Sequence, residues 1–412
     1  MMLKLVSLLG MVFLVFLAWL LSENRKAFPW RAVVWGLALQ FFFAVLILKT
    51  DFGTAVFDLA QRAVTKVNDF AIQGAQMVFG PLANQSFLAG KWGADNAFIF
   101  AITITATIIV VSALSSLLYH WGILQQVVRS MAFVMQKAMR TSGSETLAAA
   151  ANIFMGQTEA PLVIKPYLKG MTRSELLALM TGGMATIAGG VLAVYVSIGA
   201  NAGHLLTASV MSAPASLLIA KILLPEREPS ETTHGAPMKV ERPAVNSVDA
   251  LCLGATDGLH LALNVMAMLI AFVAVVALAN YLLGLVLRPF AMHATLQQVF
   301  GWVNAPFAWI IGVPAKDCLL MGQILGERIV LNEFFGYLTL TQQRAALDER
   351  SFTLGIYALC GFANFSSIAI QIGGIGALAP TRRADLARLG LRAMFGGLIA
   401  CYLTATVVGI LM

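Results

Sequence analysis

Charged residues are scarce in this sequence. Asp, Glu, Lys and Arg account for 11% of the 412 residues and hydrophobic residues for 59%, whereas charged residues usually make up about 25% of a soluble domain. This composition excludes a soluble globular protein and indicates an integral membrane protein. The apolar stretches contain no alternating ten-residue pattern, so we do not expect an outer-membrane β-barrel.

The motifs of several reactive sites are absent as well. No GxxxxGK[ST] element occurs, which leaves an ATP-driven pump without a visible nucleotide site, and no HExxH motif or His/Cys cluster supports a metalloenzyme. The cysteines have neither metal-ligand nor redox spacing, so we expect them to be small residues of the core, and we predict no cofactor. They are Cys252, Cys318, Cys360 and Cys401.

Eight apolar stretches approach the roughly 20 residues that a helix needs to cross the hydrocarbon layer. The first follows Lys4 and continues to Leu21 without a small-residue cleavage site, so it is interpreted as a membrane helix and not as a signal peptide. We therefore predict an all-α polytopic membrane protein. The predicted spans are 3–21, 32–48, 97–118, 176–198, 205–224, 259–287, 352–372 and 394–412.

Basic residues are distributed unevenly between the connecting segments. If the N-terminus faces outward, the inward-facing segments contain 17 of the 27 Lys and Arg residues. By the positive-inside rule, both termini then face outward. The net charge of +7 thus reflects topology and contact with an anionic lipid bilayer, and no motif indicates nucleic-acid binding. The inward-facing segments are 22–31, 119–140, 164–174, 221–249 and 380–393.

Two further regions are apolar but interrupted by polar residues, glycine and proline. Region 141–168 contains the polar run GQTEAP, and region 302–337 contains a central GVP and a later NEF. Irregular backbone at membrane depth is tolerated only where protein buries it or a wet cavity borders it. We therefore expect each region to form a re-entrant helical hairpin beside a solvated site.

Two other segments are too polar to cross a membrane. Segment 49–92 is amphipathic and has little net hydrophobicity, which predicts an interfacial helix along the outer surface. Segment 225–249 is rich in proline and charge and lacks periodicity, so it is interpreted as a cytoplasmic linker.

An internal repeat connects these features. The hairpin that carries Glu159 is followed by a span broken near Thr186, and the hairpin that carries Glu333 is followed by a span broken near Asn364. Under the predicted topology the two units have opposite orientations. Inverted repeats of this kind are typical of secondary transporters, whose binding site lies at the interface between the repeats.

Each polar residue in these units also has a structural interpretation. A carboxylate at the bilayer centre costs about 2.5–3.5 kcal/mol on insertion scales, which favours a functional role for Glu159 and Glu333. The alternative is a structural ion pair with a nearby base, such as Lys165 or Arg328. Gln157 and Thr158 could instead cap a half-helix, and the small polar residues of the broken spans could simply join packed helices.

Three sequence segments resemble signatures of the concentrative nucleoside transporter family, specifically its bacterial members. They are NIFMGQTEAPLVIKPYL, GERIVLNEFFGY and ALCGFANFSSIAI, and the resemblance runs in order along nearly the whole chain. Arg328 stands where the family usually has Lys, so the positive charge is retained. The resemblance implies a homotrimer in the bacterial inner membrane, with both termini periplasmic, that imports nucleosides such as uridine or adenosine with a cation, usually Na⁺.

The resemblance also implies which residues form the site. Gln157 and Thr158 are expected to contact the nucleobase, with Glu159 near it through water. Glu333, Asn364 and Ser367 are expected to hold the ribose hydroxyls, because an ionised carboxylate can accept two hydrogen bonds from a diol. The remaining residues implied are Val191 and Phe362 as pocket lining, and Asn152, Met155, Thr186 and Ile187 as oxygen donors to sodium.

The domain organisation follows from the same comparison of repeats. The expected scaffold comprises 1–48, 93–120 and 250–290, and the expected transport domain comprises the repeats 121–224 and 291–412. Proton coupling remains an alternative to sodium. An intramembrane enzyme that acts on nucleosides is a different alternative, but it needs a nucleophile or metal that the motifs do not supply. A channel is a third alternative, disfavoured because two non-identical hairpins suit a saturable site.

Overall fold

The computed structural model describes residues 2–93, 99–233, 244–290 and 294–412. In these ranges the chain is helical throughout, without strands. Short 3₁₀ turns lie at Gly80–Ala83, Lys165–Tyr167, Arg288–Phe290, Ala315–Asp317 and Pro380–Arg382. The α-helices are α1 (Met2–Leu20), α2 (Trp30–Leu48), α3 (Asp51–Phe79), α4 (Gln85–Trp92), α5 (Phe100–His120), α6 (Ile123–Met139), α7 (Gly143–Ala151), α8 (Ala160–Val163), α9 (Arg173–Ala185), α10 (Gly189–Ser197), α11 (Ala202–Leu223), α12 (Ser247–Leu287), α13 (Leu296–Ile311), α14 (Cys318–Val330), α15 (Glu333–Gln342), α16 (Glu349–Leu359), α17 (Phe365–Leu378) and α18 (Arg383–Leu411).

Seven stretches of the described residues are long and apolar enough to cross a membrane, which confirms a polytopic, all-helical membrane protein. They overlap seven of the eight predicted spans, although residues 97–98 of the third span lie outside the described residues. The eighth, 352–372, corresponds to α16 and α17, neither of which is long enough by itself. The seven stretches are Met2–Leu20, Trp30–Leu48, Phe100–His120, Arg173–Ser197, Ala202–Leu223, Ser247–Leu287 and Pro380–Leu411.

Both predicted helix breaks are present, and the chain segments that form them touch. The first lies between α9 and α10, at 186–188, and the second between α16 and α17, at 360–364. The backbone N–H of Phe362 donates to the carbonyl oxygen of Thr186 at 3.3 Å. A Cβ added at Gly361 would lie 2.7 Å from the carbonyl oxygen of Met184, so only glycine permits this close approach.

The region around the first polar run contains two helices, α7 and the four-residue α8. Helix α7 leads into turns at 152–159, and the chain returns through α8. The second region differs from the prediction of one hairpin with its turn at Gly312 and Pro314. A turn is present there, between the closely packed α13 and α14, but a second break at 331–332 separates α14 from α15. Glu333 therefore begins α15, because Asn332 caps this helix by accepting from the N–H of Phe335.

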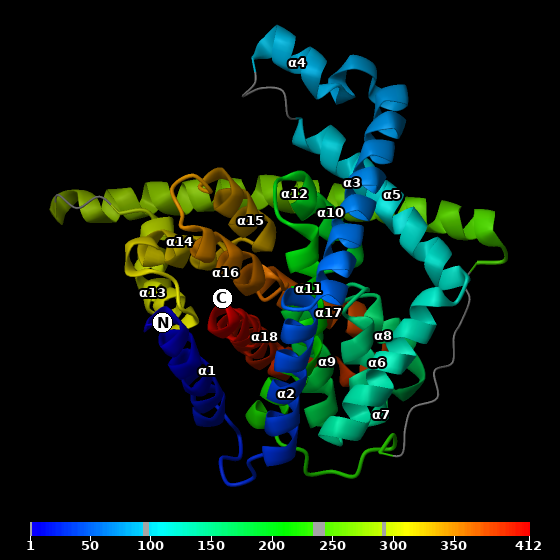
Figure 1. Ribbon diagram of the computed structural model, residues 1–412, viewed down its shortest axis with the longest axis vertical. Coiled ribbons are helices and arrows are strands. Elements are labelled where there is room, and N and C mark those ends of the chain that lie inside the picture. The colour runs from blue at the N-terminus through cyan, green and yellow to red at the C-terminus, as the bar shows by residue number, and fades with distance from the viewer. Residues whose placement is uncertain (1, 94–98, 234–243, 291–293) are drawn as a thin grey trace.

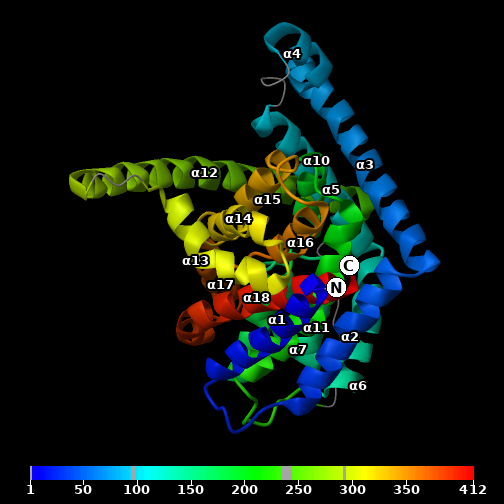
Figure 2. The same ribbon diagram turned by 60° about the vertical axis from the view of Figure 1, so that its left-hand side comes forward.

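Two long helices extend beyond the packed helices (Figures 1 and 2). Helix α12 has 41 residues and packs mainly along α5. Helix α3, within the segment predicted as interfacial, packs against α2, α5, α10 and α11 and then continues away from the body to α4. The predicted segment thus folds as two helices, of which only the first contacts the central helices extensively.

Segments that the positive-inside rule places together do lie together. The guanidinium of Arg31 donates to the carbonyl oxygen of Ala138 at 3.1 Å, and that of Arg382 donates to the carbonyl oxygen of Met171. The two chain ends lie near each other, where α1 packs against α18 (Figure 1). This arrangement agrees with two termini on one side of a membrane.

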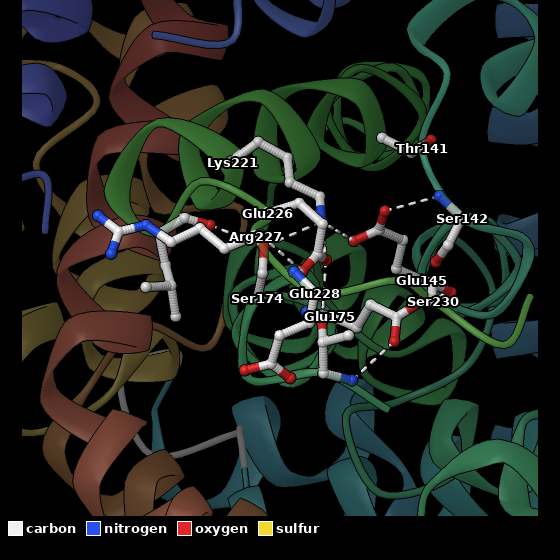
Figure 3. A network of polar contacts seen from close by, with 12 residues as sticks. Thr141, Ser142, Glu145, Ser174, Glu175, Lys221, Glu226, Arg227, Glu228 and Ser230 are labelled. Carbon is white, nitrogen blue, oxygen red and sulfur yellow. Dashed lines mark hydrogen bonds and ion pairs between the residues drawn. The ribbon is translucent and has the colours of Figure 1, made fainter. Parts of the chain in front are cut away.

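The first part of the predicted linker is anchored to the base of the first helix pair (Figure 3). The Lys221 ammonium is 2.7 Å from Glu145 Oε2, and both side chains are less than 10% exposed. Ser230 Oγ donates to Glu175, and the N–H of Gly143 donates to the carbonyl oxygen of Thr232. Residues 225–233 are non-helical, whereas the last residues of the predicted linker, 247–249, already belong to α12. Residues 234–243 of that prediction lie outside the described residues.

Removing the cation of this buried pair should destabilise the protein strongly. Lys221→Met leaves the Glu145 carboxylate buried without its partner, which costs about 3–5 kcal/mol. Lys316→Met is the matched control, because its ion pair with Asp348 is 3.8 Å long and exposed and is worth about 0–1 kcal/mol. The measurement is thermal unfolding of both variants in detergent. Equal shifts in melting temperature would contradict the expectation.

Candidate functional site

The Glu333 carboxylate lies where the second break meets α10. Tyr195 Oη, on α10, donates to Glu333 Oε1 at 2.8 Å, and Asn364 Nδ2 donates to Glu333 Oε2 at 3.0 Å. All three side chains are buried. Hydrogen bonds to an ionised carboxylate are stronger than neutral ones, so these two donors hold Glu333 in one orientation while each oxygen retains a further acceptor position.

Asn364 has two tasks at the start of α17. Its Oδ1 accepts from the backbone N–H of Ser367 at 2.9 Å, which caps the helix, and also from Ser366 Oγ. Its Nδ2 remains for Glu333. A single amide therefore begins the helix after the break and also positions the carboxylate.

The first polar run is bonded to the same helix. Gln157 Nε2 donates to Ser367 Oγ at 3.1 Å, and Gln371 Nε2 donates to Gln157 Oε1 at 3.1 Å. Gln371 Nε2 also donates to the carbonyl oxygen of Met180. Through Ser367 and Asn364 this set is continuous with Glu333. The structure thus brings Gln157, Ser367, Asn364 and Glu333 into one network, although Gln157 lies 210 residues before Ser367 in the sequence.

Four other candidates lie around this network without joining it through their side chains. Thr158 and Glu159 are exposed. Thr158 lies close to α17, because a Cβ added at Gly374 of that helix would be 3.3 Å from Thr158 Cγ2. Glu159 Oε2 accepts from the N–H of Gly156, which is local turn geometry. Val191 on α10 is buried, and Phe362 in the second break is half-buried.

The candidate ion ligands gather at the first break. Asn152 is 1% exposed, yet neither its Oδ1 nor its Nδ2 has a hydrogen-bond partner among the described residues. Thr186 and Asn152 both lie near Gly182. Thr186 Oγ1 donates to the carbonyl oxygen of Gly182, and a Cβ added at Gly182 would lie 3.2 Å from Asn152 Nδ2. Because buried polar groups are normally bonded, the unpartnered Asn152 oxygen suits a small cation. Met155 is half-buried and Ile187 buried beside them.

Neither of the structural ion pairs considered for the two glutamates is present in the described part of the chain. Arg328 is fully buried, but it donates to the carbonyl oxygen of Ala358 and to Cys401 Sγ. No ion pair links it to Glu333, and Lys165 is exposed. Glu333 is therefore hydrogen-bonded by two neutral donors, Tyr195 and Asn364.

Sequence reasoning missed two members of the network, Tyr195 and Gln371. Tyr195 lies in an apolar stretch where an aromatic residue reads as core, and Gln371 lies in QIGGIG, where glycine dominates the pattern. A polar amide inside an apolar helix was the available signal for Gln371, since buried polar groups require partners. No comparable signal distinguishes Tyr195.

Three family models together cover nearly the whole chain. They are described as the Na⁺-dependent nucleoside transporter N-terminus, matching residues 9–82, nucleoside recognition, matching 101–202, and the Na⁺-dependent nucleoside transporter C-terminus, matching 204–409. The chain belongs to the concentrative nucleoside transporter family. This membership confirms the resemblance of the three signature segments.

Full-length relatives support the same family. An uncharacterized transporter of Haemophilus influenzae is 44% identical, with 98% of this chain and 97% of that protein covered. The nucleoside permease NupC of Helicobacter pylori is 39% identical (99% and 97%). Sodium/nucleoside cotransporter 2 of Rattus norvegicus is 36% identical, over 99% of this chain and 63% of that protein. The relatives with named activities are transporters, which confirms a transporter and not an enzyme.

Two solved structures have the same fold as this chain. CNTnw in an inward-facing substrate-bound state has a TM-score of 0.93 and 38% identity, with 99% of this chain and 97% of that chain covered. A variant of CNTnw in an outward-facing state also has a TM-score of 0.93, at 37% identity, covering 100% and 98%. The same fold thus occurs in inward-facing and outward-facing states.

Close packing at Gly183 is required for the network. A Cβ there would lie 2.7 Å from Gln371 Nε2 and 3.0 Å from Gln157 Cβ. Gly183→Ala is expected to destabilise the protein by about 1–3 kcal/mol through overpacking. Gly373→Ala, on the helix that carries Gln371, is the control, since nothing lies within 4 Å of its added Cβ. Thermal unfolding in detergent measures both, and an unchanged melting temperature for Gly183→Ala would contradict the close approach.

Proposed function

We propose that this protein is a secondary active symporter that imports nucleosides, such as uridine or adenosine, driven by a sodium gradient. The observation that carries the proposal is the network that joins Gln157 of the first repeat to Glu333 of the second through Asn364 and Ser367. A solute bound there contacts both repeats at once. Family membership and the similarity to the rat sodium/nucleoside cotransporter support nucleoside and sodium as the transported pair.

The polar groups of the network suit the two halves of a nucleoside. Glu333, held by Tyr195 and Asn364, retains acceptor positions for ribose hydroxyls, with Ser367 beside it. Gln157 offers both a donor and an acceptor to a nucleobase edge. In this proposal Thr158 contacts the base directly, Glu159 does so through water, and Val191 and Phe362 line the apolar faces.

The residues at the first break fit a sodium ion. The unpartnered Asn152 oxygen and the Thr186 hydroxyl are the side-chain ligands, and Met155 and Ile187 contribute main-chain carbonyls. When bound, the ion supplies a positive charge that holds the 152–159 turns in place. An ordered turn positions Gln157 in advance, so sodium binding raises nucleoside affinity.

We propose the remaining architecture on the same basis. Repeats 121–224 and 291–412 form an inverted pair that moves as a transport domain against the scaffold 1–48, 93–120 and 250–290, which gives alternating access. Segment 49–92 is interfacial and 225–249 is a cytoplasmic linker. The chain has eight transmembrane helices and two re-entrant hairpins, and it lies in a bacterial inner membrane with periplasmic termini.

A homotrimer is part of the proposal. Helix α12 exposes large apolar side chains, among them Leu278, Tyr281 and Val286, along most of its length beyond α5. Exposed apolar surface of this extent contacts lipid or another subunit. The scaffold position of α12 favours contact between subunits, because a trimer holds the scaffold still while the transport domain moves.

Loss of the Glu333 charge is expected to abolish transport. Glu333→Gln removes one acceptor oxygen and the charge that strengthens ribose bonding, so sodium-dependent uptake of labelled uridine and adenosine into proteoliposomes should fall to background. Glu327→Gln is a matched control, since Glu327 is a second buried carboxylate on α14, bonded to Gln323 and Thr339. Wild-type uptake by Glu333→Gln would exclude the ribose assignment.

Loss of the Asn152 oxygen is expected to weaken sodium coupling specifically. Asn152→Ala should raise the sodium concentration needed for half-maximal uridine binding roughly tenfold or more, the size of one lost bond to a charged partner. Uridine binding to wild type and variant is measured across sodium concentrations at two pH values. Binding that follows pH and ignores sodium would favour proton coupling instead.

A further inference from the structure

The amide of Gln371 can take only one orientation. Its Nε2 lies 3.1 Å from the carbonyl oxygen of Met180, and a main-chain carbonyl can only accept. The Gln371 amide nitrogen must therefore face Met180. The second N–H of that nitrogen then points to the Gln157 side chain, 3.1 Å away.

This orientation determines that of Gln157. Because Gln371 presents a donor, the atom of Gln157 that faces it must be the oxygen, and the Gln157 nitrogen faces Ser367 Oγ at 3.1 Å. Gln371 is 1% exposed, and its own Oε1 has no partner among the described residues. A buried acceptor left unbonded is costly. Rotating the amide would nevertheless lose both donated bonds and place the Gln371 oxygen against the carbonyl oxygen of Met180, so the two donated bonds determine its orientation.

The other end of the network has an equally fixed direction. The backbone N–H of Ser367 can only donate, so the Asn364 oxygen faces it and the Asn364 nitrogen faces Glu333. Ser367 therefore marks the side of Gln157 that is nearer to Glu333. Gln157 has its free N–H on that side and its free lone pair on the Gln371 side.

We propose that Gln371 is a positioning residue that selects nucleobases by fixing the Gln157 amide. This rests on the proposed function, in which the sugar lies at Glu333 and the base at Gln157. The fixed amide then presents a donor near the sugar and an acceptor farther from it. It complements a base edge with an acceptor on the sugar side and a donor beyond, such as the 2-carbonyl and N3–H of uracil. Cytosine has two acceptors at those places.

The test compares uridine and cytidine binding to the full-length protein in sodium. Gln371→Met keeps the side-chain volume but removes both donated bonds, so the Gln157 amide can rotate. Uridine affinity is expected to fall about three- to tenfold, the size of one lost hydrogen bond. Cytidine affinity should fall less, so the uridine-to-cytidine preference of the wild type shrinks. This ratio does not depend on the folded fraction of the sample.

A double-mutant cycle separates positioning from a general structural effect. In a Gln157→Ala background, Gln371→Met is expected to change neither affinity, because Gln371 acts only through Gln157. Additive losses, or an equal loss for both nucleosides, would overturn the proposal. Gln40→Met is the matched control, since Gln40 is a buried glutamine that donates to the carbonyl oxygen of Met211 in another helix pair. It should leave the ratio unchanged.

Failure of the inference differs from failure of the proposed function. If Gln157→Ala leaves uridine affinity at the wild-type value, Gln157 does not contact the base, and both proposals are wrong. If Gln157→Ala weakens uridine binding while Gln371→Met leaves the ratio unchanged, the substrate site stands and the positioning role of Gln371 is wrong.

Discussion

The structure depends on one constraint: polar groups inside an apolar helical body must find partners in one another. Buried polar groups that lack a partner are costly. The two helix breaks leave main-chain N–H and C=O groups without partners inside their helices, and polar side chains lie beside them. The breaks touch between Phe362 and Thr186, and the side chains around them form a directed chain of hydrogen bonds that ends at Glu333. Most of these polar residues satisfy one another, and the exceptions among the described residues are Asn152 and the Gln371 oxygen.

That arrangement is also what gives the site its chemistry. The carboxylate is hydrogen-bonded by Tyr195 and Asn364 and not by an arginine, so two neutral donors set its orientation. Asn152 is buried without a partner at the first break. Glu333 retains acceptor positions at one end of the network, and the Gln371 oxygen has no partner among the described residues at the other. In the proposed function, the nucleoside occupies the network and the cation lies near Asn152.

The bases of the two repeats are anchored separately from the site. Near the linker, Lys221 pairs with Glu145 at the start of α7. Near the chain ends, Arg350 donates to the carbonyl oxygens of Gly312 and Gly409 and so ties the turn between α13 and α14 to α18. Ion pairs and arginine bonds therefore fix these two outer regions, while amides and hydroxyls provide most of the partners around Glu333.

The sequence by itself determined the membrane class and the helix breaks at Thr186 and Asn364, because hydropathy acts locally along the chain. The signature segments also identified the family. Tertiary structure alone decided that Gln371 and Tyr195 belong to the network, that Glu159 is exposed and outside it, and that Glu333 begins α15 after a second turn. These features depend on which helices cross and which side-chain atoms then face one another, and hydrogen-bond partners nearly 140 to 215 residues apart leave no periodic trace in a sequence.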